Sequence, residues 1–506
     1  MWAETNTAPA RIDAAAPGRG LTVGLVLLVT MVAFEALAVA TVLPVTVREL
    51  GHVSLYGWVF SAFMLANLVG TVWAGREADR WGPARPLTTG LVLFGGGLLA
   101  GGLAPTMFLL VLARVSQGAG AGAVAAVAFV IVGRAYPSEA RPRMFALMSS
   151  AWVVPGLIGP AIAGAVAQAV SWRAVFLALV PGVAVVGGLT LSVVRRIGRP
   201  VPVAARTGPQ HTDPEQGRAG GSGPEGSELT KDGPEGDTSE GSGPEVCGHR
   251  LGDALRLAAG AALLLSGLDS RNAVAAVLLV LAGLVVGLPG LRRLLPEGTG
   301  RARAGIPAAV LGRGLLTFAF FGTEAFLPLA LTSLRRQSPG VAGLVLTAAT
   351  LAWTSASWVN ARWATAWGPR RCTVTGLCLL VAGVCGSSLA ALSSAPVWSV
   401  PPLWALAGAG MGLAYPSSSL VVLDAAPGDE VGAATASLQL ADGLGTALGA
   451  GVGGAAVAFT TAAGGGARPG IATIDAVAVA VLVTALVVAQ RFPTRKARVD
   501  ADLAGS

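Results

Sequence analysis

Charged side chains are scarce in this chain of 506 residues: they make up 12% of it, while 53% of the residues are hydrophobic. A typical soluble protein carries about 25% charged residues, so this composition excludes an ordinary soluble domain. Apolar runs of about 20 residues recur instead, each long enough to cross the hydrocarbon core of a bilayer as a helix. The alternating pattern of a membrane β-barrel is absent. The sequence therefore predicts an all-α polytopic membrane protein.

Cysteine and histidine are also rare, with four and three residues. Neither a C-x-x-C pair nor a His/Cys spacing typical of metal ligands occurs, so we expect no metal site and no structural disulfide. The nucleotide-binding motif G-x-x-x-x-G-K-[ST] is absent as well, which argues against a nucleotide-driven pump. A membrane-embedded enzyme or a receptor is the alternative of another class, but no nucleophile–base constellation supports an enzyme. We expect no enzymatic activity and no cofactor.

Lysine occurs only at Lys231 and Lys496, so arginine carries most of the positive charge behind the formal net charge of +8. No basic patch with interleaved aromatic residues indicates nucleic acid as a partner. The arginines gather in alternate turns between the apolar runs, and the positive-inside rule places these turns and both termini in the cytoplasm. The polar N-terminus is expected to be a cytoplasmic tail rather than a signal peptide.

Fourteen apolar segments are predicted to span the membrane, in groups of six, two and six. They are residues 21–43, 56–74, 87–104, 107–133, 145–170, 175–194, 251–268, 273–288, 306–331, 341–359, 373–392, 397–423, 432–459 and 471–489. The predicted domains are a cytoplasmic tail (1–20), an N-terminal six-helix bundle (21–197), a linker (198–250), a central two-helix transmembrane hairpin (251–290), a cytoplasmic linker (291–305), a C-terminal six-helix bundle (306–490) and a cytoplasmic tail (491–506).

The predicted linker at 198–250 has almost no large apolar side chains. The tripeptide Gly-Pro-Glu recurs in it at 223–225, 233–235 and 243–245. Such a segment cannot bury enough surface to offset the entropy lost on ordering, so we expect it to be disordered.

A charged island at 75–85, which reads Gly-Arg-Glu-Ala-Asp-Arg-Trp-Gly-Pro-Ala-Arg, separates the second and third apolar runs. It is predicted to be a tight turn at one membrane face. A counterpart at 362–371 also contains Trp-Gly-Pro, and the first span of each six-span block contains a glutamate, Glu35 or Glu324. Parallel internal repeats of this kind are typical of transporters, with the substrate site at their interface.

Among the carboxylates within predicted spans, three are candidate functional residues: Glu35, Glu324 and Asp442. An ionised side chain at membrane depth costs about 2.5–3.5 kcal/mol on insertion scales, so each is a candidate proton carrier or cation ligand. A structural hydrogen bond, or solvation near a helix end, is the alternative. Arg114 and Gln117 share a helix face at i, i+3 and could bind a carboxylate. Tyr56 and Trp172 are expected to be anchors at the membrane interfaces.

Three motifs resemble those of the major facilitator superfamily, specifically its fourteen-helix drug/proton antiporter branch. The island resembles the loop motif G-x-L-a-D-R-x-G-R-K, with Gly75, Asp79, Arg80 and Gly82 matching and Arg85 substituting for a basic residue. Arg114, Gln117, Gly118 and Gly120 resemble R-x-x-Q-G-x-G. Gly159, Pro160 and Gly164 match the fifth-span motif G-x-x-x-G-P-x-x-G-G, in which Pro155 replaces a glycine.

The resemblance implies two six-helix bundles that alternate access to a central site. It implies a monomeric, proton-coupled antiporter in a bacterial cytoplasmic membrane, exporting small hydrophobic or cationic compounds. Export of a lipid or an endogenous secondary metabolite is the alternative. The site residues it implies fall into three groups. Glu35, Glu324, Asp442, Arg114 and Gln117 would serve proton coupling or substrate binding; Gly75, Asp79, Arg80, Gly82 and Arg85 a conformational latch; and Pro155, Gly156, Gly159, Pro160 and Gly164 a kinked, close-packed fifth helix.

Overall fold

The computed structural model describes residues 19–136, 144, 147–148, 150–195, 244–392, 395–425 and 431–492, and it is helical throughout these ranges apart from short turns. Twelve segments in this part of the chain are helices long and apolar enough to cross a membrane. The chain is therefore a multi-pass membrane protein. Both predicted tails (except 19–20 and 491–492), most of the predicted linker and the start of the predicted fifth span lie outside the described residues.

The helices form two groups with a hairpin between them in the sequence. The first group is α1 (Arg19–Leu50), α2 (Tyr56–Trp81), α3 (Ala84–Gly102), α4 (Met107–Ala135), α6 (Val153–Ala169), α7 (Trp172–Leu177) and α8 (Leu179–Val194). The hairpin is α9 (Pro244–Asp269) and α10 (Ala273–Leu294). The second group is α11 (Ile306–Leu329), α12 (Pro339–Trp367), α13 (Pro369–Leu392), α14 (Val400–Ala425), α15 (Val431–Ala462) and α16 (Ala467–Ala489), with a π-helical turn η4 (Ala330–Leu334) after α11.

The prediction of fourteen spans is not confirmed in full. The twelve qualifying segments include both hairpin helices, but α3 and α6 fall short. α3 is only 19 residues long, rich in glycine and begins with Ala-Arg-Pro, and α6 has 17 residues. These features lower the length or the hydropathy of the two helices, so the total of fourteen stays a prediction.

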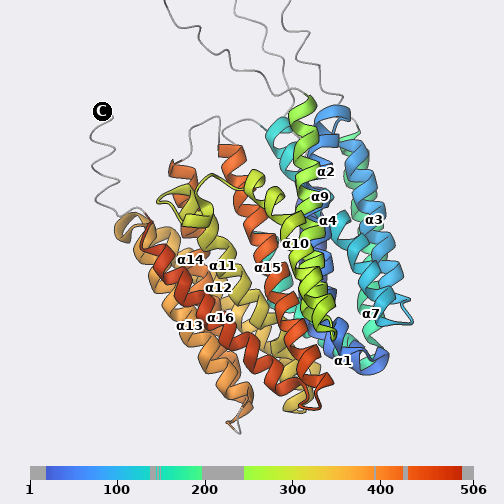
Figure 1. Cartoon of the computed structure of the whole chain (residues 1–506). Coiled ribbons are helices and arrows are strands. Elements are labelled where there is room, and N and C mark those ends of the chain that lie inside the picture. Colours follow the sequence, from blue (N-terminus) through green and yellow to red (C-terminus); the bar gives the residue numbers. More distant parts are fainter. Residues whose placement is uncertain are drawn as a thin grey trace, which may run out of the picture.

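The two groups of helices lie side by side and meet along two seams, α2 against α15 and α6 against α12 (Figure 1). Glycines allow the close approach. A Cβ added at Gly57 on α2 would lie 2.7 Å from the Gly454 Cα on α15, and one added at Gly343 on α12 would lie 2.7 Å from the Pro160 oxygen on α6. Small residues at helix crossings are the usual means of close packing in membranes.

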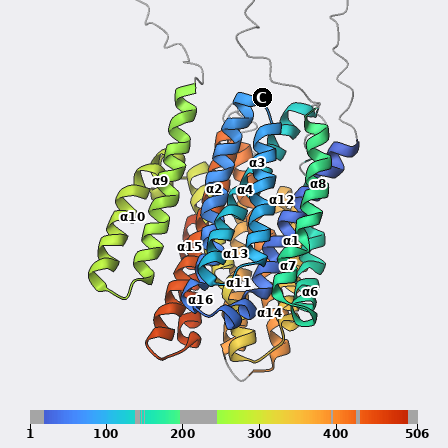
Figure 2. The same cartoon turned by 90° about the vertical axis from the view of Figure 1, so that its right-hand side faces the viewer.

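The hairpin lies at the side of the molecule rather than between the two halves in space (Figure 2). α9 packs against both α2 and α15 and so covers their seam, whereas α10 packs mainly against α9. Gly260 and Gly283 bring α9 and α10 together, and α10 turns exposed valines and leucines outward. Such an apolar surface is suited to lipid.

The hairpin begins earlier in the sequence than predicted. α9 begins at Pro244, seven residues before the predicted start at 251 and inside the segment predicted to be disordered. Proline fits the first turn of a helix because its missing N–H has no partner there in any case. The third Gly-Pro-Glu repeat therefore coincides with a helix start.

The charged island is mostly helical, so the predicted turn is wrong for its first seven residues. α2 continues to Trp81, and only Gly82 and Pro83 separate it from α3. Arg, Glu and Ala are good helix formers, so nothing ends the helix before Gly82, which adopts φ 82°. Its counterpart Gly368 adopts φ 79° between α12 and α13. The two halves thus repeat the same break with the same backbone conformation.

Candidate functional site

A buried ion pair lies inside the first group of helices. Glu35 on α1 is fully buried, and the Arg114 guanidinium on α4, which is 2% exposed, donates to its Oε1. The other carboxylate oxygen, Oε2, has no hydrogen-bond partner among the described residues. The predicted candidates Glu35 and Arg114 are therefore brought together, from helices far apart in the sequence.

Arg114 also connects the ion pair to the two remaining helices of this cluster. Its Nε donates to the Val59 oxygen of α2 at 3.1 Å, and its guanidinium lies 4.1 Å from the centre of the Phe63 ring. It donates to Gln117 Oε1 as well, and Gln117 Nε2 donates to the Gly97 oxygen of α3 at 2.7 Å. One charged side chain thus holds α1, α2 and α4 directly and α3 through Gln117.

The second group of helices contains a different polar cluster, centred on Asp442 of α15. The hydroxyl of Tyr415 on α14 donates to Asp442 Oδ2 at 2.7 Å, while Oδ1 has no hydrogen-bond partner among the described residues. The guanidinium of Arg313 on α11 lies 3.4 Å from the centre of the Tyr415 ring. The tyrosine therefore stands between an arginine and a carboxylate that form no direct ion pair in the described part of the chain.

Arg313 and Tyr415 were missed by sequence reasoning. Arg313 is 2% exposed and donates to the hydroxyls of Ser418 and Ser419 at 2.9 and 2.6 Å. The signal was present, because an arginine within an apolar run indicates a functional or structural site by default. Its partners could not be found, since they are hydroxyls and a ring rather than a carboxylate.

Aromatic side chains extend from this cluster. The Trp353 ring on α12 lies 5.4 Å from that of Tyr415 and 6.3 Å from that of Phe321 on α11, and all three side chains are half-buried. Phe320 packs on Trp353 at 5.6 Å and stacks on Trp404 at 5.1 Å. We call Phe320, Phe321, Trp353, Trp404 and Tyr415 the aromatic cluster. Aromatic ring faces attract cations. In this cluster the Tyr415 side chain also contacts the Asp442 carboxylate.

Glu324 lies on α11 and joins neither of these polar clusters. It is half-buried and makes no ion pair or hydrogen bond with the residues that the structure describes. Pro328, four residues later, cannot donate to its carbonyl, and a π-helical turn follows at 330–334. Glu35 and Glu324 occupy matching places in the sequence repeat but have different surroundings.

The predicted motif helix lies at the seam between the two halves. Pro155, Gly156, Gly159, Pro160 and Gly164 are buried on α6. A Cβ added at Gly156 would overlap Thr350 on α12, and one at Gly164 would lie 3.1 Å from Gly340. Gly156, Pro160 and Gly164 therefore set how closely α6 approaches α12.

Replacing Gly156 with valine is expected to reduce transport several-fold, because the new side chain forces α6 away from α12. Overpacking of this kind costs about 1–3 kcal/mol. Substrate efflux from intact cells would measure the effect, with Gly188→Val on α8 as the control, since an added Cβ there meets nothing within 4 Å. Equal activity of both variants would contradict a role for this close approach.

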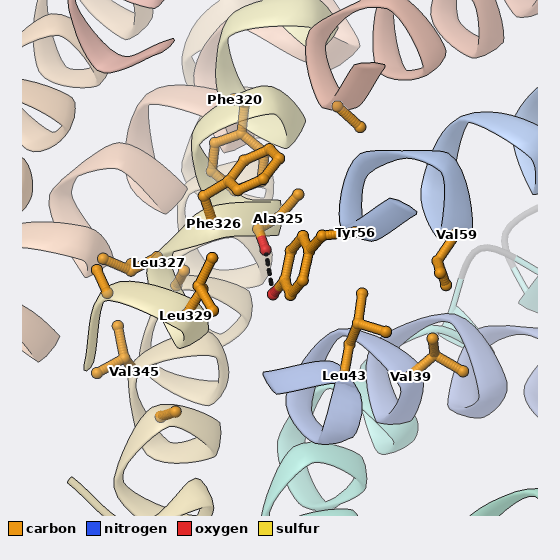
Figure 3. Packing of buried hydrophobic residues seen from close by; sticks show 14 of the residues in the cluster. Val39, Leu43, Tyr56, Val59, Phe320, Ala325, Phe326, Leu327, Leu329 and Val345 are labelled. Carbon is orange, nitrogen blue, oxygen red and sulfur yellow. Dashed lines mark hydrogen bonds between the residues drawn. The ribbon is translucent and has the colours of Figure 1, made fainter. Parts of the chain in front are cut away.

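Tyr56 and Trp172 are not interfacial anchors, contrary to prediction. Tyr56 is fully buried, and its hydroxyl donates to the Ala325 oxygen at 2.9 Å, joining α2 to α11 across the two halves (Figure 3). Trp172 is 1% exposed and donates to Glu49 at 2.7 Å. Their position next to polar turns was identified correctly, but packing between helices decides their burial.

The residues proposed as a latch lie at the junction of α2 and α3. Asp79, Arg80 and Arg85 are exposed, and the Arg85 guanidinium lies 4.8 Å from the centre of the Trp81 ring. A Cβ added at Gly75 would meet nothing within 4 Å. The latch therefore stays a prediction, and Gly82 acts here as the helix break.

Two halves with repeated breaks, packed along two seams, define a multi-pass membrane transporter. The chain belongs to the Major Facilitator Superfamily, whose family model matches residues 23–232 and 309–503. The predicted membership is confirmed. The stretch between the two matched segments holds the α9–α10 hairpin.

Two bacterial proteins named as multidrug transporters are among the relatives of this chain. The chain is 27% identical over 441 residues to a probable multidrug-efflux transporter of Mycobacterium tuberculosis, a match that covers 84% of each chain. It is 31% identical over 171 residues to Multidrug resistance protein 3 of Bacillus subtilis, where the match spans only 33% of that protein's length.

Solved structures of transporters share the fold. A POT family transporter in complex with 5-aminolevulinic acid superimposes with a TM-score of 0.63 at 15% identity, covering 94% of this chain and 98% of that one. A bacterial homologue of the human lysosomal transporter Spinster superimposes with a TM-score of 0.59 at 14% identity, covering 96% and 98%. At these identities the likeness concerns the fold alone.

Proposed function

We propose that this chain is a proton-coupled antiporter of the drug/proton branch, which exports small hydrophobic or cationic compounds by alternating access. It would work as a single chain in a bacterial cytoplasmic membrane, with both termini in the cytoplasm and the proton gradient in place of a cofactor. The names of its relatives in Mycobacterium tuberculosis and Bacillus subtilis support the substrate class. The predicted fourteen spans, with the hairpin as two of them, belong to the same proposal.

The observation that carries the proposal is the position of Asp442 beside the aromatic cluster. One of its oxygens is held by Tyr415 and the other has no hydrogen-bond partner among the described residues. A lipophilic cation would place its charge near the carboxylate and its apolar body on the rings of Phe321 and Trp353, a combination that favours cations over neutral compounds. A proton on Asp442 would remove the negative charge, so proton and cation would compete for one site.

The buried Glu35–Arg114 pair supplies the second element of the mechanism. Arg114 would lose its ion pair with α1 when Glu35 is protonated, since a neutral carboxylic acid no longer compensates the guanidinium charge, while its contacts with α2 would remain. A proton arriving at Glu35 would therefore weaken the contact between α1 and α4 and favour their rearrangement. Inward movement of one charge across about 100 mV supplies about 2.3 kcal/mol, before any pH gradient is added.

An imposed pH gradient tests the proposal directly. Membrane vesicles turned inside out, with an acidic interior, are expected to accumulate a fluorescent lipophilic cation, and collapse of the gradient by a protonophore should release it. Vesicles without the protein are the control. Accumulation that is unaffected by the protonophore would contradict proton coupling. Accumulation of a lipid or a secondary metabolite but of no cation would favour the alternative cargo.

A further inference from the structure

Another buried carboxylate, in the second group of membrane helices, has no part in the mechanism above. Asp475 lies on α16, is 7% exposed, and faces α11 and α13 within the second group of helices. Sequence reasoning missed it. An ionised carboxylate is costly at membrane depth, so its presence there requires an explanation.

Two hydroxyls from other helices surround Asp475. Thr323 on α11 and Ser388 on α13 lie close enough to interact with the carboxylate, yet Asp475 Oδ1, Thr323 Oγ1 and Ser388 Oγ all lack a hydrogen-bond partner among the described residues. Unpaired polar groups are expensive in a membrane interior. The three polar groups therefore lie near one another in the membrane interior without the hydrogen bonds that would satisfy them.

Thr323 differs from its neighbours in the same helix. Thr317 donates to the Arg313 oxygen at 3.1 Å, and Thr332 donates to the Pro328 oxygen at 2.8 Å, each four residues earlier. This local bond is the usual way for a threonine to satisfy its hydroxyl inside a helix. The Thr323 hydroxyl does not form this local hydrogen bond and so remains available to Asp475.

Within the described residues, no fixed positive charge pairs with Asp475. The charged groups on the elements packed against it are Arg313 and Glu324 on α11, Arg335 after η4, Arg370 and Arg371 on α13, Asp442 on α15 and Arg468 on α16 itself. None of them forms an ion pair with Asp475 in the part of the chain that the structure describes. Without a fixed counter-charge among the described residues, this carboxylate can be neutral only with a bound proton or a mobile cation.

We propose that Asp475, Thr323 and Ser388 form a proton-binding site within the C-terminal half, built from residues other than Asp442 and the aromatic cluster. The carboxylate takes up one proton to become a neutral carboxylic acid, whose O–H donates to one of the two hydroxyls. A metal cation fits less well, because hard cations need about six oxygen ligands and only one carboxylate and two hydroxyls converge here.

The position of Thr323 connects this site to the contact between the two halves. Two residues further along α11, the Ala325 oxygen accepts the hydrogen bond of Tyr56, and Pro328 and the π-helical turn follow. Such irregular helix segments are frequent at functional sites and yield more easily than regular helix. A proton on Asp475 would shift the part of α11 that accepts the hydrogen bond of Tyr56. Protonation would thereby change the stability of the contact between the two halves. This part of the inference rests on the proposed function, whereas proton binding itself does not.

Carbodiimide labelling of the purified full chain tests proton binding without any transport assay. Dicyclohexylcarbodiimide reacts with protonated carboxyl groups in apolar surroundings. Mass spectrometry is expected to find the label on Asp475 at low pH and about tenfold less per pH unit above the midpoint. Thr323→Val should retain the label to higher pH because the ionised form loses a donor, while Thr332→Val should match the parent. Absence of label at every pH, or protection by Na⁺ at fixed pH, would overturn the proposal.

Spin labels at position 52, on an exposed turn before α2, and at position 461, at the exposed end of α15, test the connection to Tyr56. In a chain whose native cysteines are replaced, the distance distribution is expected to shift with pH. Asp475→Asn, which imitates the neutral acid, should fix the low-pH distribution. Asp475→Glu, which keeps the carboxylate, should preserve the shift. This control separates the loss of the carboxylate from the effect of substitution itself. A shift that survives unchanged in Asp475→Asn would overturn the connection even if transport is proton-coupled.

Discussion

Arg114→Ala is expected to lower the free energy of unfolding by about 3–5 kcal/mol and to abolish transport. Removing the guanidinium leaves the Glu35 carboxylate buried without a partner, and an uncompensated buried charge carries that penalty. The hydrogen bonds to Val59 and Gln117 are lost as well. Thermal unfolding of the purified protein in detergent measures the first effect, and dye efflux from cells measures the second.

The chain offers a matched control for this experiment. Arg173 pairs with Glu49, but both side chains are partly exposed, at 31% and 49%. Exposed pairs contribute about 0–1 kcal/mol, so Arg173→Ala should be nearly neutral in stability. The double variant Glu35→Leu with Arg114→Leu should recover most of the stability but no transport. Full transport by the double variant would show that the pair is only structural.

Asp442→Asn is expected to weaken the binding of a lipophilic cation at least about tenfold, which corresponds to about 1.4 kcal/mol. The amide keeps the shape of the side chain and a hydrogen bond to Tyr415 but removes the charge that faces the aromatic cluster. Equilibrium binding of a fluorescent cation to purified protein measures the loss. Binding should also become independent of pH, because the competing proton no longer has this site.

Gln439→Ala is the control for Asp442→Asn, since Gln439 lies one turn away on the same helix and is exposed. It should leave binding unchanged. A neutral compound of similar size should bind Asp442→Asn as well as the parent. If the cation binds Asp442→Asn with unchanged affinity and pH dependence, the substrate site lies elsewhere.

Much of the fold could be predicted because membrane helices must be apolar over a fixed length. The hydropathy pattern located most of the helices, and the repeated Trp-Gly-Pro indicated two related halves. The hydropathy pattern placed the end of α2 too early, since charged residues mark the membrane boundary but do not end a helix. The helix α2 instead ends just before Gly82, whose positive φ favours glycine.

The site was predictable only in part. An intramembrane charge is visible in a sequence, which is why Glu35, Arg114 and Asp442 were found. Their partners are not, because Glu35 and Arg114 are 79 positions apart and no spacing rule joins them. Tyr56 looked interfacial by its place next to a turn, yet it is buried against α11. Contacts of this kind arise from tertiary packing, which local patterns do not record.

The central claim is that substrate and protons move in opposite directions through this chain. The most direct measurement uses purified protein in liposomes that enclose a pH-sensitive dye. A lipophilic cation loaded inside should leave only while protons enter, so the lumen acidifies in step with efflux. Asp442→Asn should show neither movement. Efflux from the parent protein with no change in luminal pH would contradict the account.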